Sequence, residues 1–316
     1  MSSAVAERPP PVVDVSAGAA ARPGRGTWRA VRARRRPAVR QTSAATEVLI
    51  AVGLAAVWVL LYAFVFSGVQ EARSQSVLYD QLREGLAGGT TPYGGVIAPG
   101  TPIALIDAPS VGTRGLVVVE GTDSAMLRLG PGHRRDTPLP GQSGISLLYG
   151  RSVTYGAPFD NVSGLKSAQT FTVTTGQGVF RYRVDDVRRE GDPLPAPLTA
   201  GGSRVVLETS EASGWRAGWA PSGVVLVDAT LQGQTQPAIG ARLPGVATEE
   251  KALKGDTRSL NTLVLWLELL LVTVGAAVLA RTRWGRRPAW LVGLPAVLAV
   301  LWGTTSAAML LLPNLT

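Results

Sequence analysis

TFTVTTGQGVFRYRV, residues 170–184, shows the pattern that decides the fold of the central part of this chain. β-Branched and aromatic residues fill two short runs, which are separated by a turn rich in glycine. Comparable runs, with Gly or Pro between them, occur at 103–106, 116–120, 146–149, 204–208 and 224–230, which makes seven with 171–175 and 179–184. Many short strands with closely spaced turn signals are typical of a β-barrel or a β-sandwich. We therefore predict a mainly β domain over residues 96–232.

The composition limits the chemistry and the partners of this protein. The 316-residue sequence has no cysteine, which excludes disulfides, thiolate metal sites and thiol catalysis. Its single histidine, His133, cannot build a multi-histidine metal site, and we expect neither a metal nor a cofactor. The net charge of +9 arises from nine Arg in residues 1–45 and four in residues 281–287, so the remainder is close to neutral. This distribution does not indicate nucleic acid as a partner.

Three apolar segments predict membrane-spanning helices. Residues 48–68 are an uncharged run long enough to cross a hydrocarbon core of roughly 30 Å. We therefore place the first transmembrane helix at 46–68 and interpret it as an uncleaved signal anchor. The second and third transmembrane helices are expected at 259–280 and 289–312.

The basic segments predict the orientation of the chain in the membrane. The tail 1–45 is rich in Pro, Ala, Gly and Arg, and we expect it to be disordered. The positive-inside rule places both this tail and the loop 281–288 in the cytoplasm. The β domain and residues 313–316 are then extracytoplasmic, and the chain is a multi-pass protein of the plasma membrane. We expect a juxtamembrane helix and linker at 69–95 and a polar linker at 233–258.

Ordered motifs at consistent spacing run through the β domain. They are PIALIDAP (102–109), VVVEGTDSAMLRLGPGH (117–133), TPLPGQSGISLLYGR (137–151), TYGAPFDNV (154–162), TFTVTTGQGVFRYRV (170–184), VVLETS (205–210) and VVLVDATL (224–231). In these motifs the sequence resembles the sortases, and most closely the actinobacterial class E sortases. The resemblance implies an eight-stranded β-barrel with a few short helices, which the three predicted transmembrane helices would anchor to the membrane. It also implies a peptide ligand, because sortases cleave a sorting signal near the C-terminus of a secreted protein and join its carbonyl to an amine.

The residues that carry sortase chemistry are replaced in this sequence. The family uses a cysteine thiolate as nucleophile, a histidine for proton transfer and an arginine that stabilises the developing oxyanion. The histidine position corresponds to Arg151, the cysteine position to Ser210 and the arginine position to Val224. We therefore expect no catalytic residue among these three.

Ser210 has two carboxylates close to it in the sequence. Glu208 is expected on the same face of the strand as Ser210, and Glu211 on the opposite face. One hypothesis is a serine nucleophile assisted by a glutamate. The favoured interpretation is that Ser210 is a near-isosteric relic and that the two glutamates are solvated or pair with Arg151.

Other residues are candidates for contacts in a groove or with a partner. His133, in the GPGH motif, is expected to be a loop histidine with local hydrogen bonds. Trp215 and Trp219 are four residues apart, which suits a binding platform for a peptide or lipid headgroup, or packing at the membrane interface or core. Arg216 is either a hydrogen-bond donor of the site or a surface residue. The full candidate set is His133, Tyr155, Glu208, Trp215, Arg216 and Trp219.

Polar residues also occur inside the predicted spans. Glu268 lies in the second span, where an unpaired carboxylate is costly and therefore a functional candidate. Thr304 and Thr305 in the third span are expected to hydrogen-bond it. Such contacts would dock the two helices together or onto another membrane protein.

Three functional hypotheses follow. The first is a catalytically inactive, membrane-anchored sortase-like protein that binds a peptide or acts as a scaffold, with another membrane or secreted surface protein as its partner. The second is an active transpeptidase or hydrolase that uses Ser210. The third is an accessory subunit of a transporter or channel, although three spans without broken-helix repeats are few for a transporter itself.

Overall fold

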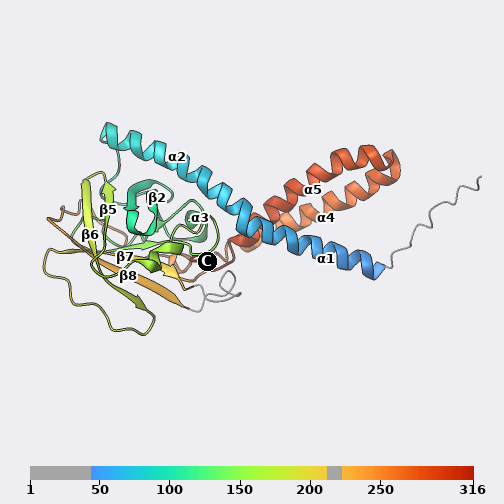
Figure 1. The fold of residues 1–316 in the computed structure, drawn as a ribbon. Helices are drawn as coiled ribbons and strands as arrows, with labels where there is room; N and C mark the ends of the chain where they lie inside the picture. The colour runs from blue at the N-terminus through green and yellow to red at the C-terminus, as the bar shows by residue number, and fades with distance from the viewer. Residues whose placement is uncertain (1–43, 212–222) are drawn as a thin grey trace, which may run out of the picture. The chain divides into compact units, whose positions relative to one another are not determined.

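Eight strands close into a barrel in the computed structural model, which describes residues 44–211 and 223–316 (Figure 1). The strands are β1 (Pro102–Ala108), β2 (Thr113–Glu120), β3 (Gly132–His133), β4 (Gly144–Tyr149), β5 (Thr170–Thr175), β6 (Gly178–Arg189), β7 (Ser203–Ser210) and β8 (Val224–Leu231). Their order around the barrel is β1-β2-β3-β4-β7-β8-β6-β5. The mainly β fold and the closed eight-stranded barrel expected from the sequence are confirmed.

Each of the seven runs identified in the sequence lies inside one of these strands. The one strand that no run predicted is β3, whose two residues are too few to show an alternating pattern. Two neighbouring pairs, β2–β3 and β4–β7, are parallel, and the other pairs are antiparallel. Because β4 and β7 are parallel, the segments that follow them emerge at the same end of the barrel.

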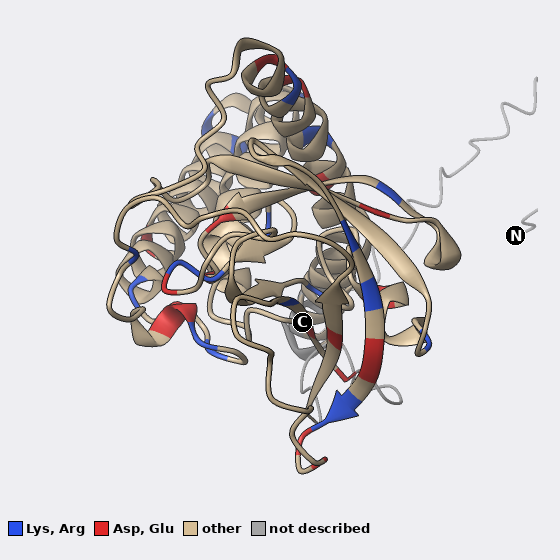
Figure 2. Ribbon diagram, turned by 90° about the vertical axis from the view of Figure 1, so that its left-hand side faces the viewer, with Lys and Arg blue, Asp and Glu red and all other residues tan. Residues whose placement is uncertain are grey.

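The barrel interior is filled by alternate residues of its strands. In β6, Phe180, Tyr182 and Val184 are buried, whereas Arg181 and Arg183 between them are exposed. This period of two is what a strand with one face on the core requires. Figure 2 shows that acidic and basic residues are interspersed along the ribbon of the barrel.

One long helical run leads into the barrel. It consists of α1 (Ala44–Leu61), a π-helical turn η1 (Tyr62–Phe66) and α2 (Ser67–Gly88), with no break between them. The sequence had indicated a span and a separate juxtamembrane helix, because charged and polar residues begin soon after Phe66. The helix instead continues to Gly88 and is capped by Gly89, which adopts the left-handed conformation (φ 65°) that ends many helices.

The polar half of this run lies on the barrel. Leu78 and Leu82 of α2 are buried against Val117 and Val119 of β2. The Gln75 amide accepts a hydrogen bond from the Val117 backbone N–H (2.8 Å) and donates to the Val117 carbonyl (3.1 Å). These contacts fix α2 across β2.

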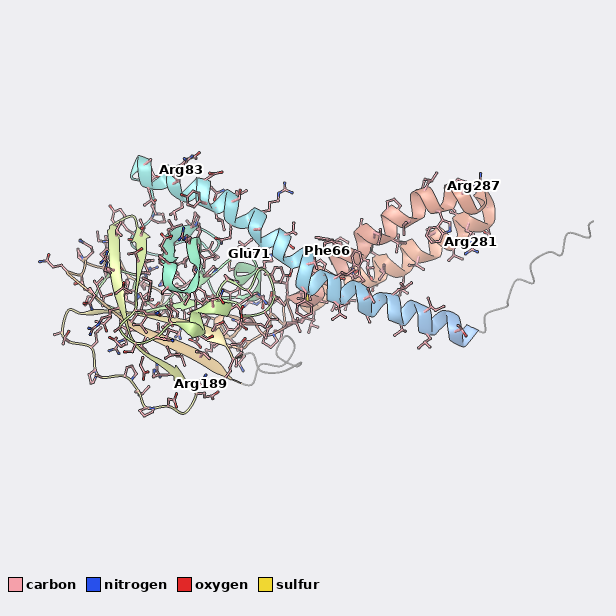
Figure 3. The ribbon with its side chains drawn as sticks, in the orientation of Figure 1. Phe66, Glu71, Arg83, Arg189, Arg281 and Arg287 are labelled. Atoms are coloured by element: carbon pink, nitrogen blue, oxygen red, sulfur yellow. The ribbon has the colours of Figure 1, made fainter. Side chains whose placement is uncertain are left out.

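Two further helices form a hairpin at the end of the chain. They are α4 (Ser259–Trp284) and α5 (Arg286–Met309), joined at Gly285. The basic segment 281–288, expected as a loop, is therefore mostly helical. Arg281 and Arg287, labelled in Figure 3, belong to the last turn of α4 and the first turn of α5. Three helices of the described chain are long and apolar enough to cross a membrane.

The segment 233–258 packs on the barrel instead of hanging free. Arg242 forms an ion pair with Glu120 (Nη1 to Oε1, 2.9 Å). Thr122 Oγ1 donates to the Glu250 carbonyl at 2.6 Å. The shorter helices of the described chain are η2 (Pro109–Val111), α3 (Ser124–Leu127), η3 (Asp160–Gly164) and η4 (Thr248–Glu250).

Candidate functional site

The three positions singled out by the sequence meet at one end of the barrel. Ser210 ends β7 and pairs with Val224, the first residue of β8. Arg151 follows β4, which runs parallel to β7. The residue after it, Ser152, has its Oγ 2.6 Å from Ser210 Oγ. The structure therefore brings together residues that are far apart in the chain.

Gly150 fixes the backbone that presents Arg151. Its N–H donates to the Glu208 carbonyl at 3.0 Å, and its carbonyl accepts from Thr209 Oγ1 at 2.9 Å. A Cβ atom at position 150 would collide with the ring of Phe159. Glycine is needed here for close packing, so position 150 cannot supply a proton-transfer side chain.

Arg151 is completely buried and faces hydrogen-bond acceptors. Its guanidinium donates to Thr154 Oγ1 (3.2 Å) and to the carbonyls of Leu127 (3.3 Å), Ser124 (3.3 Å) and Thr316 (2.7 Å). Burial lowers the pKa of Arg151 to about 10, so the group is still a cation at neutral pH. It can hold carbonyl oxygens but cannot take up a proton.

The acceptors at the centre of the site belong to the end of this same chain. The Leu315 carbonyl accepts from Ser210 Oγ (2.9 Å) and from the Ser152 backbone N–H (3.0 Å). The Thr316 carbonyl accepts from Arg151 and, at 2.5 Å, from Thr154 Oγ1. We call residues 313–316 the C-terminal segment. It occupies the site that Arg151 and Ser210 form.

Ser210 Oγ has two hydrogen-bond partners in the described parts of the chain, and neither is a base. The Leu315 carbonyl can only accept, and the Ser152 hydroxyl is not basic at neutral pH. A serine becomes a good nucleophile when an adjacent base removes its proton. In this arrangement the Ser210 hydroxyl acts as a hydrogen-bond donor to a peptide carbonyl.

The two glutamates beside Ser210 do not lie as the sequence suggested. Glu208 is buried (8% exposed), and burial raises its pKa to about 7, while a hydrogen bond to Tyr149 opposes that shift. Glu211 forms an ion pair with Arg189 (2.7 Å). The expectation that Glu208 is solvated is wrong, and the expected pairing with Arg151 does not occur among the contacts described for Glu208, because Arg151 turns toward the C-terminal segment.

His133 is buried in β3 and not in a loop. Its Nε2 lies 3.0 Å from the Pro138 carbonyl and 3.1 Å from Thr137 Oγ1, which agrees with the expected local hydrogen bonds. Its Nδ1 lies 2.9 Å from Glu120 Oε2. Both ring nitrogens therefore have partners, and these contacts hold β2, β3 and the 134–138 turn together.

The other candidate contacts divide into two groups. Tyr155 is buried beside the site, with its ring 4.9 Å from the Arg151 guanidinium carbon, so it stacks on that cation. Trp215, Arg216 and Trp219 lie outside the described residues.

The polar residues of the spans contact other partners than expected. Thr304 Oγ1 donates to Val300 and Trp266 carbonyls (2.9 and 3.3 Å), and Thr305 Oγ1 accepts from Trp58 Nε1 (3.0 Å). Glu268 is exposed on α4 and has no hydrogen-bond or ion-pair partner among the described residues. The predicted pairing of Glu268 with these threonines is wrong, because Glu268 lies on the outer face of α4.

Sequence reasoning missed Ser152, Thr154 and the C-terminal segment as parts of this site. Ser152 and Thr154 immediately follow Arg151, so their position was a usable signal. The C-terminal segment offered none, since its partner Arg151 lies 165 residues away. The part of the chain that the structure describes holds no cluster of His, Cys, Asp or Glu suited to a metal ion.

The barrel and this end of it can be compared with known families. Residues 106–211 match the model of the sortase domain. The matched stretch runs from β1 to the residue after Ser210, so it contains the Arg151 and Ser210 positions. No protein of curated function matches the sequence.

Several solved sortase structures are similar to this chain. The sortase D5 transpeptidase of Clostridium perfringens is 20% identical, over 52% of this chain and 99% of that one, with a TM-score of 0.40. Sortase E of Streptomyces avermitilis is 28% identical, over 45% of this chain and 93% of that one, with a TM-score of 0.36. Sortase C-1 of Actinomyces oris is 24% identical, over 50% of this chain and 99% of that one, with a TM-score of 0.36.

Proposed function

We propose that this protein is a membrane-anchored, catalytically inactive sortase-like protein whose barrel binds a peptide segment without cleaving it. One observation carries the proposal. Arg151 and Ser210, at the positions where the family has histidine and cysteine, each donate a hydrogen bond to a main-chain carbonyl of the C-terminal segment. The site therefore offers donors to a peptide backbone.

The chemistry of the same residues supports the absence of turnover. The sequence holds no thiol, and the arginine in the histidine position cannot accept a proton. Val224 in the arginine position is apolar and packs partly buried against Leu315. Three losses in one site remove nucleophile, base and oxyanion donor together.

The membrane anchorage extends this proposal to the cell surface. The basic residues at the α4–α5 turn and in residues 1–45 favour a cytoplasmic position for both, which leaves the barrel extracytoplasmic. Glu268, exposed and unpartnered on α4 in the described chain, supports assembly with another membrane protein that supplies a polar group. The barrel then serves as a peptide-binding or scaffolding component of that complex.

A second function, transpeptidation or hydrolysis through Ser210, is favoured by one observation. Glu208 precedes Ser210 by two residues on β7, and its pKa of about 7 suits a general base. Against it, the described contacts of Ser210 Oγ are with Ser152 and Leu315.

The experiment that decides between the two uses the full chain in detergent. It is incubated with sorting-signal-like peptides and an amine acceptor, and mass spectrometry follows cleavage, transfer and any covalent adduct on Ser210. The proposal expects no product and no adduct. An adduct that disappears in Ser210→Ala would refute inactivity and establish a serine enzyme.

A further inference from the structure

The C-terminal segment fills the site as a peptide ligand would. Asn314, Leu315 and Thr316 are each completely buried. A segment that merely lay on the surface of the barrel would be solvated. Here each of the three residues makes a different kind of contact.

Leu315 provides the apolar contact. Its side chain packs with Leu127 and Tyr149, and Val224 lies partly buried against the same cluster. Its carbonyl is held by Ser152 and Ser210. A branched aliphatic side chain is thus inserted into an apolar pocket while its main chain is fixed by hydrogen bonds.

Asn314 and Thr316 provide the polar contacts on either side. The Asn314 amide donates to the carbonyls of Thr122 (2.8 Å) and Lys251 (3.0 Å), which an aspartate could not do. The Thr316 hydroxyl donates to the Pro313 carbonyl at 2.7 Å, which closes a turn. That turn directs the Thr316 carbonyl to Arg151.

We propose that the C-terminal segment is a tethered ligand, which occupies the site in cis. Other peptides whose consecutive side chains are an amide, a branched aliphatic and a hydroxyl bind to the site only after they displace this segment. This rests on the proposed peptide-binding function and adds the identity of the occupant and its regulation of access. A tethered ligand meets its site at a high effective concentration, so a free peptide competes poorly with it. The site is therefore closed until a partner peptide is abundant or the C-terminal segment is withdrawn.

The test exploits the cysteine-free sequence, because any introduced cysteine is the only thiol of the chain. The full chain in detergent carries Leu315→Cys, and alkylation by a maleimide is followed with time. A buried side chain must open before it reacts, so we expect labelling at least about tenfold slower than for Leu194→Cys on the exposed surface (85% exposed). Excess Leu-Pro-Asn-Leu-Thr peptide, as acid and as amide, should accelerate the labelling of Leu315→Cys severalfold.

Matched controls separate displacement from unfolding. Leu148→Cys, buried inside the barrel, should stay protected in the presence of the peptide. A peptide with aspartate in place of its second leucine should have no effect. Arg151→Ala combined with Leu315→Cys should label faster without any peptide.

Two results would overturn the inference. Labelling of Leu315→Cys as fast as that of Leu194→Cys would show that the C-terminal segment does not occupy the site. Protection that saturating peptide leaves unchanged would show a permanent structural contact without exchange. Because alkylation does not depend on catalysis, peptide cleavage with normal displacement would refute only the proposed inactivity.

Discussion

Arg151 is a buried cation that is stabilised by carbonyl dipoles and an aromatic ring. Its described partners are three main-chain carbonyls, the Thr154 hydroxyl and the Tyr155 ring. Buried polar groups are costly when their partners are removed, since each is left without a hydrogen bond. At the scale of single residues, Arg151 therefore holds the barrel, the β4–η3 loop and the C-terminal segment together.

Replacing Arg151 should destabilise the protein. Arg151→Met keeps the length of the side chain but removes the guanidinium that donates to the carbonyls of Leu127, Ser124 and Thr316, so we expect a loss of about 2–4 kcal/mol in the free energy of unfolding. Denaturant unfolding of the full chain measures it. The exposed Arg183→Met is the matched control, with an expected change within about 0.5 kcal/mol. Equal effects would show that Arg151 makes no special contribution.

Glu208 should make stability depend on pH. Burial raises its pKa from 4.5 to about 7 in the folded protein, so the folded state binds a proton that the unfolded state has released. Its contribution to stability is therefore present below about pH 4.5 and is lost as the pH rises toward 7. Glu208→Gln, which stays neutral, should lose less stability than the parent between pH 5 and 7, as measured by melting temperature. Glu190→Gln on the surface should follow the parent, and a Glu208→Gln profile parallel to the parent would contradict this assignment.

At the scale of elements, hydrogen bonds join the apolar helices. Trp58 of α1 donates to Thr305 of α5, and Thr304 of α5 contacts the Trp266 carbonyl of α4. Tyr62 and Trp302 also pack edge to face, with ring centroids 5.0 Å apart. The helical part of the chain is thus tied through α5 to both other helices.

Removing the indole donor should weaken this packing. Trp58→Phe keeps the aromatic ring but leaves Thr305 without its donor, so we expect a loss of about 1 kcal/mol. The thermal unfolding midpoint in lipid nanodiscs measures the effect. Trp290→Phe, at an exposed position, should leave the midpoint unchanged, and a similar shift in both variants would argue against the Trp58–Thr305 bond.

Glu268 belongs to the same helices but points away from them. Glu268→Leu should leave the stability of the isolated chain in detergent unchanged or slightly higher, because the carboxylate has no partner among the described residues. The unfolding midpoint tests this. A clear loss of stability would reveal an internal partner and remove the argument for a partner protein at this position.

At the scale of the whole molecule, the pattern of short strands was enough to predict the barrel, because alternation of buried and exposed residues is a local property of the sequence. The motifs also singled out Arg151, Ser210 and Val224, which lie at one end of the barrel. The occupant of the site could not be predicted from the sequence, since the contact of Thr316 with Arg151 is long-range and no local pattern encodes it. The sequence likewise placed Glu268 opposite Thr304, because the direction of a side chain around an apolar helix depends on how the helices pack.

The orientation in the membrane makes a prediction that cysteine labelling can test. Single cysteines at Ser163, exposed on the barrel, and at Trp284, beside the α4–α5 turn, each give the only thiol of the protein. In intact cells, an impermeant maleimide should label Ser163→Cys and spare Trp284→Cys, because the basic turn favours the cytoplasm. After lysis both should react. The opposite pattern in intact cells would invert the proposed topology.

The position of residues 313–316 after α5 also has a consequence for the order of synthesis. Proteins are made from the N-terminus, so all eight strands precede the two helices of the hairpin, and these precede the segment that occupies the site. Arg151 and Ser210 therefore have no Leu315 or Thr316 to hold while the strands are being made. The site reaches its final state only after α5 has been synthesised, so an occupied site is a sign that both helices of the hairpin have been made.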